Sequence, residues 1–409
     1  MIELLLDEGS PSRFSDGYFG TIDRRPVCVL YKEGVFDGCK CDVIDLALKV
    51  GVPIVNIFNC EDFEVSLKTF SEAINLLSKL GLANGVVPRI TVFLNKVHWL
   101  LSYQTDFVAV SENVEYSLVM PEVIKSFTGK DVEISAEFHM KSGNCHIIGE
   151  SDEVVFSLVR KLISFLPLNN MEDPPIAETR DDVRRTIDFE IPSDPYQPFD
   201  MKGLISQVLD DEEFFEIQEA YAQNVIVGFG RLDGVSVGIV ANNPAYELGC
   251  LDIDGMKKII SFVRFCDAFN IPVVNFVDTP GFLPDFEQEI SGLARYMSRL
   301  VDVYSQATTP VITVIVRKAY SGLIAMGLTG SDVVFSYPNA EFAVIDADTD
   351  SSKLGVERKD YVEGVRKLAF ELLVDDVIDV KWTRSKIINA LRLLETKRRK
   401  LPPKKCDVL

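Results

Sequence analysis

The sequence has few of the residues on which metal or redox sites usually depend. Its 409 residues contain 3 His, and no pair of Cys residues has the Cys-x-x-Cys spacing or a nearby His spacing typical of zinc sites. We therefore expect no bound metal. We expect the cysteines to be reduced and mostly buried, since free Cys behaves as a small apolar residue. They are Cys28, Cys39, Cys41, Cys60, Cys145, Cys250, Cys266 and Cys406.

Positive charge is also scarce, because 42 Lys and Arg residues face 62 Asp and Glu residues and give a formal net charge of −20. A surface that binds nucleic acid needs a basic footprint, so nucleic acid is excluded as an expected partner. No apolar run approaches the roughly 20 residues that span a bilayer, and residues 1–9 lack a basic segment of the signal-peptide kind. We expect a cytoplasmic protein without a membrane span.

A phosphate-binding loop of the form Gly-x4-Gly-Lys-Ser/Thr is missing from the whole chain. The string from Asp278 to Gly281 could otherwise suggest a GTPase switch, and without that loop we discard the interpretation.

What the sequence does contain is enough apolar residues, 47%, to bury more than one core, and its length predicts two or three domains. Residues 167–198 are polar and rich in Pro, and they show no apolar periodicity. We therefore predict a first domain at residues 1–168, a linker at 169–199 and a second domain at 200–409.

The two predicted domains repeat the same strings in the same order. The string Pro-x-Val-Asn begins at Pro53 and again at Pro272, an offset of 272 − 53 = 219 residues. The string Pro-x-Ile-Thr-Val begins at Pro88, and its counterpart Pro-Val-Ile-Thr-Val begins at Pro310, an offset of 310 − 88 = 222. Each string reads as a buried strand, so the repeat predicts two related sheets.

Helical patterns separate these strands. Asp42 and Asp252 are suitable caps for helices, and longer helices are predicted at residues 65–80 and 287–307. Apolar strands alternating with helices are typical of a sheet that is covered on both faces. The predicted fold class is α/β, with two tandem domains of this kind.

Two strings in the second half resemble a known family. Residues 262–284 and 309–322 closely resemble the carboxyltransferase (beta) subunits of biotin-dependent acyl-CoA carboxylases, of the propionyl-CoA carboxylase type, in the crotonase superfamily. The resemblance covers most of the chain, and it is specific at residues 200–345 and diffuse at residues 1–165. It implies a crotonase-like β-sheet superhelix wrapped by helices in each half.

The resemblance also implies an activity and partners. In such enzymes a carboxyl group passes between biotin, carried on a biotin carboxyl carrier protein, and the α-carbon of an acyl-CoA such as propionyl- or acetyl-CoA. A biotin carboxylase subunit is the other implied partner, and the chain is expected to form a dimer or a hexamer. The family binds acyl-CoA mainly on the first domain and biotin mainly on the second.

The chemistry needs hydrogen-bond donors for oxyanions, since negative charge develops on the thioester oxygen and on the ureido oxygen of biotin. At the glycine turn of the second half this sequence reads Ser321, Gly322 and Leu323. The resemblance assigns the oxyanion hole to the main-chain N–H groups of Gly322 and Leu323. It places Gly281, Phe282 and Ser321 on the biotin side.

The first half departs from the family pattern, because there is no glycine between Gly85 and Gly129. Alignment from Pro88 places Trp99 and Leu100 where the paired glycines belong, and alignment back from residues 105–107 places Lys96 and Val97 there. In either case bulky side chains would crowd a thioester. The candidate substrate-binding residues are Lys96, Val97, His98 and Trp99. His98 could be a general acid or base, or it could be structural.

Several alternatives stay open from the sequence alone. The chain could be the alpha subunit of a biotin-dependent acyl-CoA decarboxylase, or a non-catalytic scaffold paralogue that has lost acyl-CoA binding. Arg317 and Lys318 could attract an anionic substrate or could simply end a strand. For His139 and His146 we expect structural hydrogen bonds.

Overall fold

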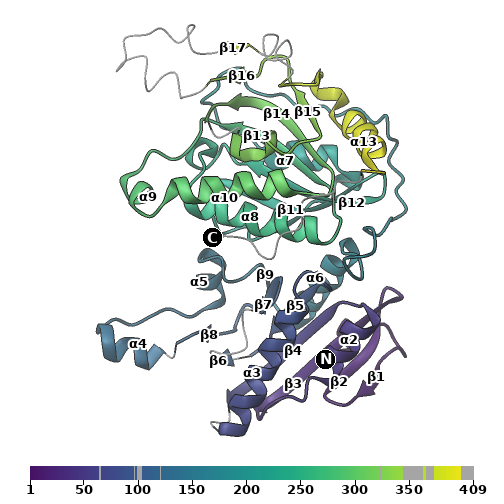
Figure 1. Cartoon of the computed structure of the whole chain (residues 1–409), viewed down its shortest axis with the longest axis vertical. Coiled ribbons are helices and arrows are strands. Elements are labelled where there is room, and N and C mark those ends of the chain that lie inside the picture. Colours follow the sequence, from purple (N-terminus) through teal and green to yellow (C-terminus); the bar gives the residue numbers. More distant parts are fainter. Residues whose placement is uncertain are drawn as a thin grey trace. The chain divides into compact units, whose positions relative to one another are not determined.

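The chain forms two compact units (Figure 1). The computed structural model describes residues 1–63, 66–95, 97–98, 104–119, 121–321, 324–343, 363–364 and 373–397. The first unit comprises Met1–Pro175 and Gln218–Tyr221, and the second comprises Ile176–Ile217 and Ala222–Leu409. Residues 176–199, most of the segment where we predict a linker, thus group with the second unit.

The first unit is built on a sheet of order β1-β2-β3-β4-β5-β7-β9, in which β1, β2 and β3 are antiparallel and the remaining pairs are parallel. A separate short parallel pair joins β6 to β8. The strands are β1 Ser12–Phe14, β2 Gly17–Ile22, β3 Arg25–Phe36, β4 Ile54–Phe63, β5 Arg89–Phe93, β6 Val97–His98, β7 Phe107–Ser111, β8 Tyr116–Ser117 and β9 Ile147–Gly149.

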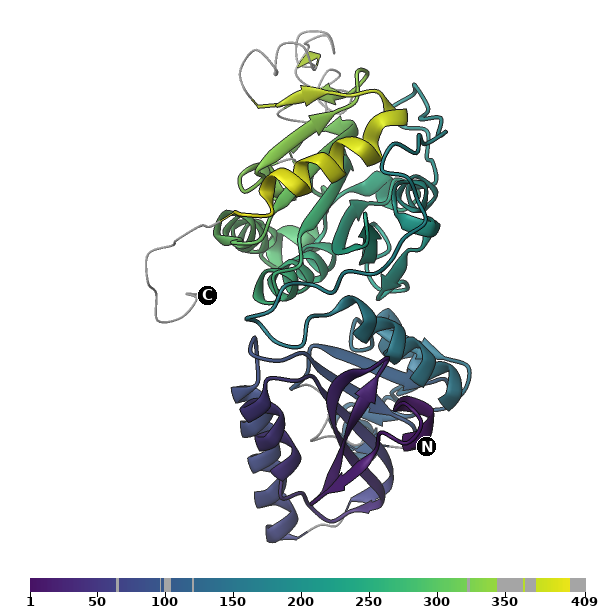
Figure 2. The ribbon, with the colours of Figure 1, turned by 90° about the vertical axis from the view of Figure 1, so that its right-hand side faces the viewer.

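Helices lie on both sides of this sheet, and Figure 2 shows α3 and α6 on opposite sides. Helices α2 and α3 bury Ile44 and Leu76 in one core cluster with Cys28 and Leu30 of β3, while α6 contacts β7 and β9. The helices are α1 Ile2–Leu5, α2 Asp42–Val50, α3 Leu67–Leu82, α4 Pro121–Thr128, α5 Ala136–Lys141 and α6 Asp152–Phe165.

The second unit repeats this topology with the order β10-β11-β12-β13-β14-β15-β18, and β16 joins β14 to β17. Again the first three strands are antiparallel and the following ones parallel. The strands are β10 Phe215–Ile217, β11 Val225–Leu232, β12 Val235–Asn242, β13 Val273–Thr279, β14 Val311–Ala319, β15 Val333–Ser336, β16 Glu341–Phe342, β17 Glu363–Gly364 and β18 Asp376–Val377.

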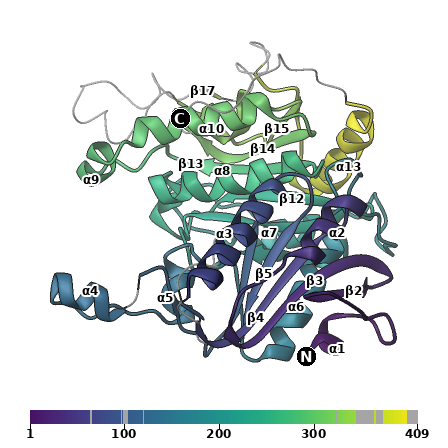
Figure 3. The ribbon, with the colours of Figure 1, turned by 60° about the horizontal axis from the view of Figure 1, so that its bottom comes forward.

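Helices cover both faces of the second sheet as well (Figures 1 and 3). On one face α7 and α13 share a core cluster with the strands, and on the other α8 packs closely at Gly238, where a Cβ would lie 2.6 Å from the sulfur of Cys266. The glycine therefore sets the helix–sheet distance. The helices are α7 Met201–Val208, α8 Ile253–Ala268, α9 Phe286–Ile290, α10 Leu293–Gln306 and α13 Thr383–Leu394.

The repeated strings occupy equivalent positions in the two sheets. Asn56 of β4 lies opposite Thr91 of β5, and its amide donates to the Thr91 hydroxyl at 3.3 Å. Asn275 of β13 lies opposite Thr313 of β14, and the same hydrogen bond measures 3.1 Å. The prediction of two related α/β sheets is confirmed.

Two details of the predicted helices are wrong. Asp42 is the first residue of α2 and not its cap, because the carboxylate of Asp16 accepts the N–H groups of Cys41 and Val43 instead. The helix predicted at residues 287–307 is two helices, α9 and α10, separated at Gly292, whose φ of 93° ends regular helix. The predicted cap at Asp252 is confirmed, since its side chain accepts the N–H of Gly255.

A buried ion pair fastens α13 to the second unit. Arg384 is fully buried and donates to a carboxylate oxygen of Asp210 at 2.5 Å and to the carbonyl of Val208 at 2.9 Å. Asp210 also accepts the N–H groups of Asp233 and Gly234. Removing one partner of such a pair leaves an uncompensated buried charge.

We predict that Arg384→Ala lowers the free energy of unfolding of the second unit by about 3–5 kcal/mol, the cost of breaking a buried pair. Urea denaturation measures this. Arg392→Ala is the matched control on the same helix, because Arg392 is exposed and pairs with Asp233 at the surface. Its loss should stay below about 1 kcal/mol. Equal losses in the two variants would contradict the account.

His146 holds β7 in place in the first unit. Its Nδ1 accepts the N–H of Val108 at 3.1 Å, so the ring proton is on Nε2. Burial lowers the pKa of His146 to about 4. The ring is therefore neutral at physiological pH and acts as a structural hydrogen-bond acceptor, as we expected. His139 is buried, and its carbonyl accepts the N–H groups of Asn144 and Cys145.

The lowered pKa of His146 makes stability depend on pH. Between the ordinary value of 6.5 and about 4, the unfolded chain binds a proton that the folded chain does not, so stability falls as the pH falls. We predict that denaturation at pH 7 and pH 5 gives a loss about 2 kcal/mol larger in the native protein than in His146→Gln. The same loss in both would show that His146 does not stay neutral in the folded state.

Candidate functional site

The loop that follows β13 is held rigidly at the carboxyl end of the strand. The N–H of Asp278 donates to the side-chain oxygen of Asn242 at 3.2 Å, and the N–H of Gly281 donates to the hydroxyl of Thr279 at 3.0 Å. Gly281 has a φ of 123°, a conformation that side chains disfavour.

Main-chain bonds complete the loop. The N–H of Leu251 donates to the carbonyl of Gly281 at 2.8 Å, and that of Leu283 donates to the carbonyl of Leu251 at 2.9 Å. Gly281 and Phe282 thus have a fixed position, and Phe282 is only half-buried.

The turn that follows β14 lies beside this loop. Thr279 pairs with Ala319, and the N–H of Tyr320 donates to the carbonyl of Thr279 at 3.2 Å. Ser321, which is partly exposed, comes next. The structure therefore brings Gly281 and Ser321 to the same edge of one sheet. Gly322 and Leu323, the candidate oxyanion-hole residues, lie outside the described residues.

Behind this loop and turn lies a group of buried charges. Arg317 donates to the two carboxylate oxygens of Asp278 at 3.3 and 2.8 Å, and the ammonium of Lys318 lies 3.5 Å from the same carboxylate. Asp278 and Lys318 are fully buried, and Arg317 is 4% exposed. Burial lowers the pKa of Lys318, and the charge of Asp278 opposes the shift. These cations are not open to solvent.

In the first unit the candidate substrate residues are only partly described. Val97 and His98 make up strand β6, whose main chain pairs in parallel with that of Tyr116 and Ser117 in β8. Lys96 and Trp99 lie outside the described residues. Strand β6 follows the carboxyl end of β5, the position where α/β sheets commonly bind ligands.

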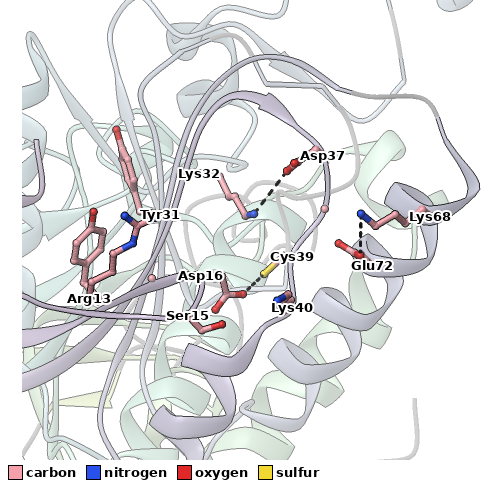
Figure 4. Close-up of a pocket in the computed structure, with 13 residues that line it drawn as sticks. Arg13, Ser15, Asp16, Tyr31, Lys32, Asp37, Cys39, Lys40, Lys68 and Glu72 are labelled. Atoms are coloured by element: carbon pink, nitrogen blue, oxygen red, sulfur yellow. Dashed lines mark hydrogen bonds and ion pairs between the residues drawn. The ribbon is translucent and has the colours of Figure 1, made fainter.

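A cavity of about 380 Å³ opens at the carboxyl end of β3 in the same unit (Figure 4). It was not predicted from the sequence, since it joins residues from the β1–β2 hairpin, β3, the loop before α2 and the start of α3. Its charged lining consists of the cations Arg13, Lys32, Lys40 and Lys68 and the carboxylates Asp16, Asp37 and Glu72.

The cations of this cavity are weakly paired. Lys32 lies 3.8 Å from Asp37, and Lys68 lies 4.0 Å from Glu72, both at the outer limit of an ion pair. Asp16 is engaged differently, since it accepts the thiol of Cys39 at 2.9 Å and the N–H groups at the start of α2. The cavity therefore has a positive excess in a chain whose net charge is −20. It suits a ligand with anionic groups.

Most thiols in the described part of the chain are buried. The cysteines there are free, and all but Cys250 are buried. Hydrogen bonding from Cys41 and burial raise the pKa of Cys39. Within the described residues no group of His, Cys, Asp and Glu is arranged to hold a metal ion, and no helix is long and apolar enough to cross a membrane.

Comparison with known proteins identifies the family. The family described as "Carboxyl transferase domain" matches residues 41–409. The chain is 38% identical to the biotin-dependent acetyl-/propionyl-coenzyme A carboxylase beta5 subunit of Mycobacterium tuberculosis, over 95% of this chain and 80% of that protein. It is 37% identical to the methylmalonyl-CoA decarboxylase subunit alpha of Veillonella parvula, over 95% of this chain and 83% of that protein.

A solved structure agrees over the whole chain. The transcarboxylase 12S structure, described as a hexamer assembly with hydrolysed methylmalonyl-coenzyme A bound, matches with a TM-score of 0.94 and 32% identity, covering 100% of this chain and 91% of that one. The predicted tandem crotonase-like architecture is thereby confirmed. The chain belongs to the carboxyl transferase family, that of the carboxyltransferase (beta) subunits of biotin-dependent acyl-CoA carboxylases.

Proposed function

We propose that the chain is an enzyme subunit that moves a carboxyl group between carboxybiotin, presented by a carrier protein, and the α-carbon of a short acyl-CoA. One observation carries the proposal: β13 and β14 hold the Gly281 loop and the Ser321 turn against each other, through the bond from the Tyr320 N–H to the Thr279 carbonyl. Family membership supplies the chemistry that such a site performs.

The second unit supplies the biotin side of the reaction. Gly281 presents no side chain, and Phe282 offers a half-exposed ring beside it, so the loop can receive the flat ureido ring of biotin. The main-chain N–H groups of Gly322 and Leu323 donate to the developing oxyanion. Serine at position 321 removes none of these donors, because they belong to the main chain. One such donor contributes about 3 kcal/mol to the transition state.

The first unit binds the acyl-CoA in this proposal, with Lys96, Val97, His98 and Trp99 near the thioester. Strands β3, β4 and β5 are adjacent and parallel, and Lys32 of the cavity is level with Phe93 at the end of β5, two strand spacings or about 10 Å away. An extended CoA can span that distance. Its phosphates would meet the cations of the cavity.

We also propose the larger assembly from the relatives. Domains at residues 1–168 and 200–409 correspond to the two carboxyltransferase domains, and the chain works as a homo-oligomer, a dimer or a hexamer. A biotin carboxyl carrier protein and a biotin carboxylase subunit act with it. Acetyl- and propionyl-CoA are the proposed substrates, in keeping with the name of a relative.

Two further candidates each have an observation in their favour. The similarity to a decarboxylase alpha subunit favours transfer in the opposite direction, from the acyl-CoA to biotin. The lack of glycine between Gly85 and Gly129 favours a scaffold that no longer binds acyl-CoA.

The decisive experiment mixes the purified chain with a biotinylated carrier protein, biotin carboxylase, ATP and labelled bicarbonate. We expect label to appear in propionyl- or acetyl-CoA. Label transferred only from malonyl- or methylmalonyl-CoA to the carrier would identify a decarboxylase subunit. No transfer in either direction, together with no binding of acyl-CoA in calorimetry, would identify a scaffold and end the proposal.

The cavity gives a prediction about affinity. Replacing Arg13 or Lys40 with Gln should raise KM for acyl-CoA about fivefold without changing kcat, because a surface charge contributes about 1 kcal/mol to binding a phosphate. Lys49→Gln is the control, since Lys49 is exposed on α2 and does not line the cavity. Unchanged KM in both cavity variants would place the CoA phosphates elsewhere.

The Gly281 loop gives a prediction about turnover. Gly281→Ala should lower kcat at least tenfold and leave the Kd of acyl-CoA unchanged, because a side chain at φ 123° forces the loop to shift. Gly292→Ala is the matched control: its φ is 93°, a Cβ there meets nothing closer than 3.9 Å, and it lies at the start of α10. It should cost stability only, and equal losses of kcat would contradict the assignment.

A further inference from the structure

A segment distant in sequence is fastened across the ends of β13 and β14. The guanidinium of Arg317 donates to the carbonyls of Asp194 and Gln197 at 2.6 and 2.8 Å, and the ammonium of Lys318 donates to the carbonyl of Pro195 at 2.7 Å. The ring of Phe199 lies 5.0 Å from the guanidinium carbon. We call residues 194–199 the strap. It is bound through main-chain carbonyls, so its attachment depends on the two cations.

Among the residues that the structure describes, the charges in this cluster do not balance. One carboxylate, that of Asp278, contacts two cations, Arg317 and Lys318, and these three side chains are at most 4% exposed. The carbonyls of the strap accept these hydrogen bonds as neutral dipoles, so with Arg317 and Lys318 both protonated the described contact group carries one excess positive charge. Buried charge without a counter-charge is unfavourable. An anion placed nearby would offset it.

The cluster is joined to both parts of the candidate site. The N–H of Lys318 donates to the Asp278 carboxylate at 2.9 Å, which ties the end of β14 to the end of β13, just before the Gly281 loop. Ser321 follows Lys318 by three residues. A shift of the Lys318 backbone would therefore move the loop and the turn together.

We propose that Lys318 is a positioning residue for carboxyl transfer: it holds the strap against the ends of β13 and β14, fixes the loop relative to the turn, and places positive charge behind the anionic reacting group. This inference rests on the proposed function. Lys318 does not touch the reacting atoms in this account. Its effect on them is transmitted through Asp278 and the electrostatic field.

Lys318→Met separates this role from a purely structural one. Methionine keeps most of the apolar stem, and the Asp278–Arg317 pair that remains is neutral and bidentate, so the fold should persist. Asp278→Asn is a poorer test, because it would leave two buried cations without a carboxylate and would destabilise the unit.

In the assay with biotinylated carrier protein, biotin carboxylase, ATP, bicarbonate and acyl-CoA, we expect Lys318→Met to lower kcat about tenfold relative to the wild type, which corresponds to 1.4 kcal/mol. KM for acyl-CoA should not change. Lys318→Arg, which keeps the charge, should recover at least part of the loss. In hydrogen exchange the four amides of the strap, those of Asp194, Tyr196, Gln197 and Phe199, should exchange faster in the Met variant than in the wild type.

The matched control is Lys258→Met. Lys258 is 2% exposed, and its ammonium donates to the carbonyl of Val225 at 2.7 Å, away from the β13 and β14 ends. It should leave kcat unchanged. The inference is overturned if Lys318→Met has wild-type kcat, or if Lys318→Arg and Lys258→Met lose as much activity as Lys318→Met. An inactive wild type would instead overturn the proposed function, and strap exchange would still be measurable.

Discussion

The parallel pairing of β13 with β14 is the interaction on which the candidate site depends. Parallel strands end at the same edge of a sheet, so the segments that follow them become neighbours however far apart they are in sequence. Here the pairing extends from Val273 and Val311 to Thr279 and Ala319. A slip of one residue would turn Lys318 away from Asp278 and separate the Gly281 loop from the Ser321 turn. The catalytic interpretation thus depends on a register set by buried residues far from the chemistry.

That register is fixed in part by a polar contact within an otherwise apolar sheet. Asn275 donates to Thr313, and its oxygen accepts the hydroxyl of Tyr304 from α10 at 2.7 Å. The first unit has the equivalent pair, Asn56 and Thr91, but the oxygen of Asn56 has no hydrogen-bond partner among the described residues. A buried amide with one unsatisfied oxygen is less favourable than a fully bonded one. Both units therefore have the same Asn–Thr hydrogen bond, and among the described residues only the Asn of the second unit also has a partner for its side-chain oxygen.

The sequence predicted well what local patterning determines. The repeated strings predicted the central strands of both sheets to within a few residues, because a short apolar run that follows Pro is typical of a buried strand. The sequence could not show that Asp16 caps α2, because strands β2 and β3 lie between them in the chain. Nor could the sequence show that the side chains of Asp278, Arg317 and Lys318 form one cluster. Its partners in the strap lie about 120 residues away, and single-sequence patterns carry no information on such contacts.

In the proposed function the two units bind different ligands, and the two ligands make different demands. A site for the small ring of biotin needs a fixed loop and a few main-chain donors; the second unit has a fixed loop at Gly281, and the proposal assigns the donors to the turn that follows Ser321. A site for CoA needs room for a long substrate and cations for its phosphates. The first unit has bulky residues where the family has glycine, yet it gathers Arg13, Lys32, Lys40 and Lys68 around one cavity in a strongly acidic chain. Acidic surfaces repel a polyanion such as CoA, so a cavity whose four cations outnumber its three carboxylates is a favoured place for the phosphates. In this proposal the loss of glycine would restrict the thioester end of the substrate, whereas binding of the phosphates depends on charge, so the two parts of the CoA site can change independently of each other.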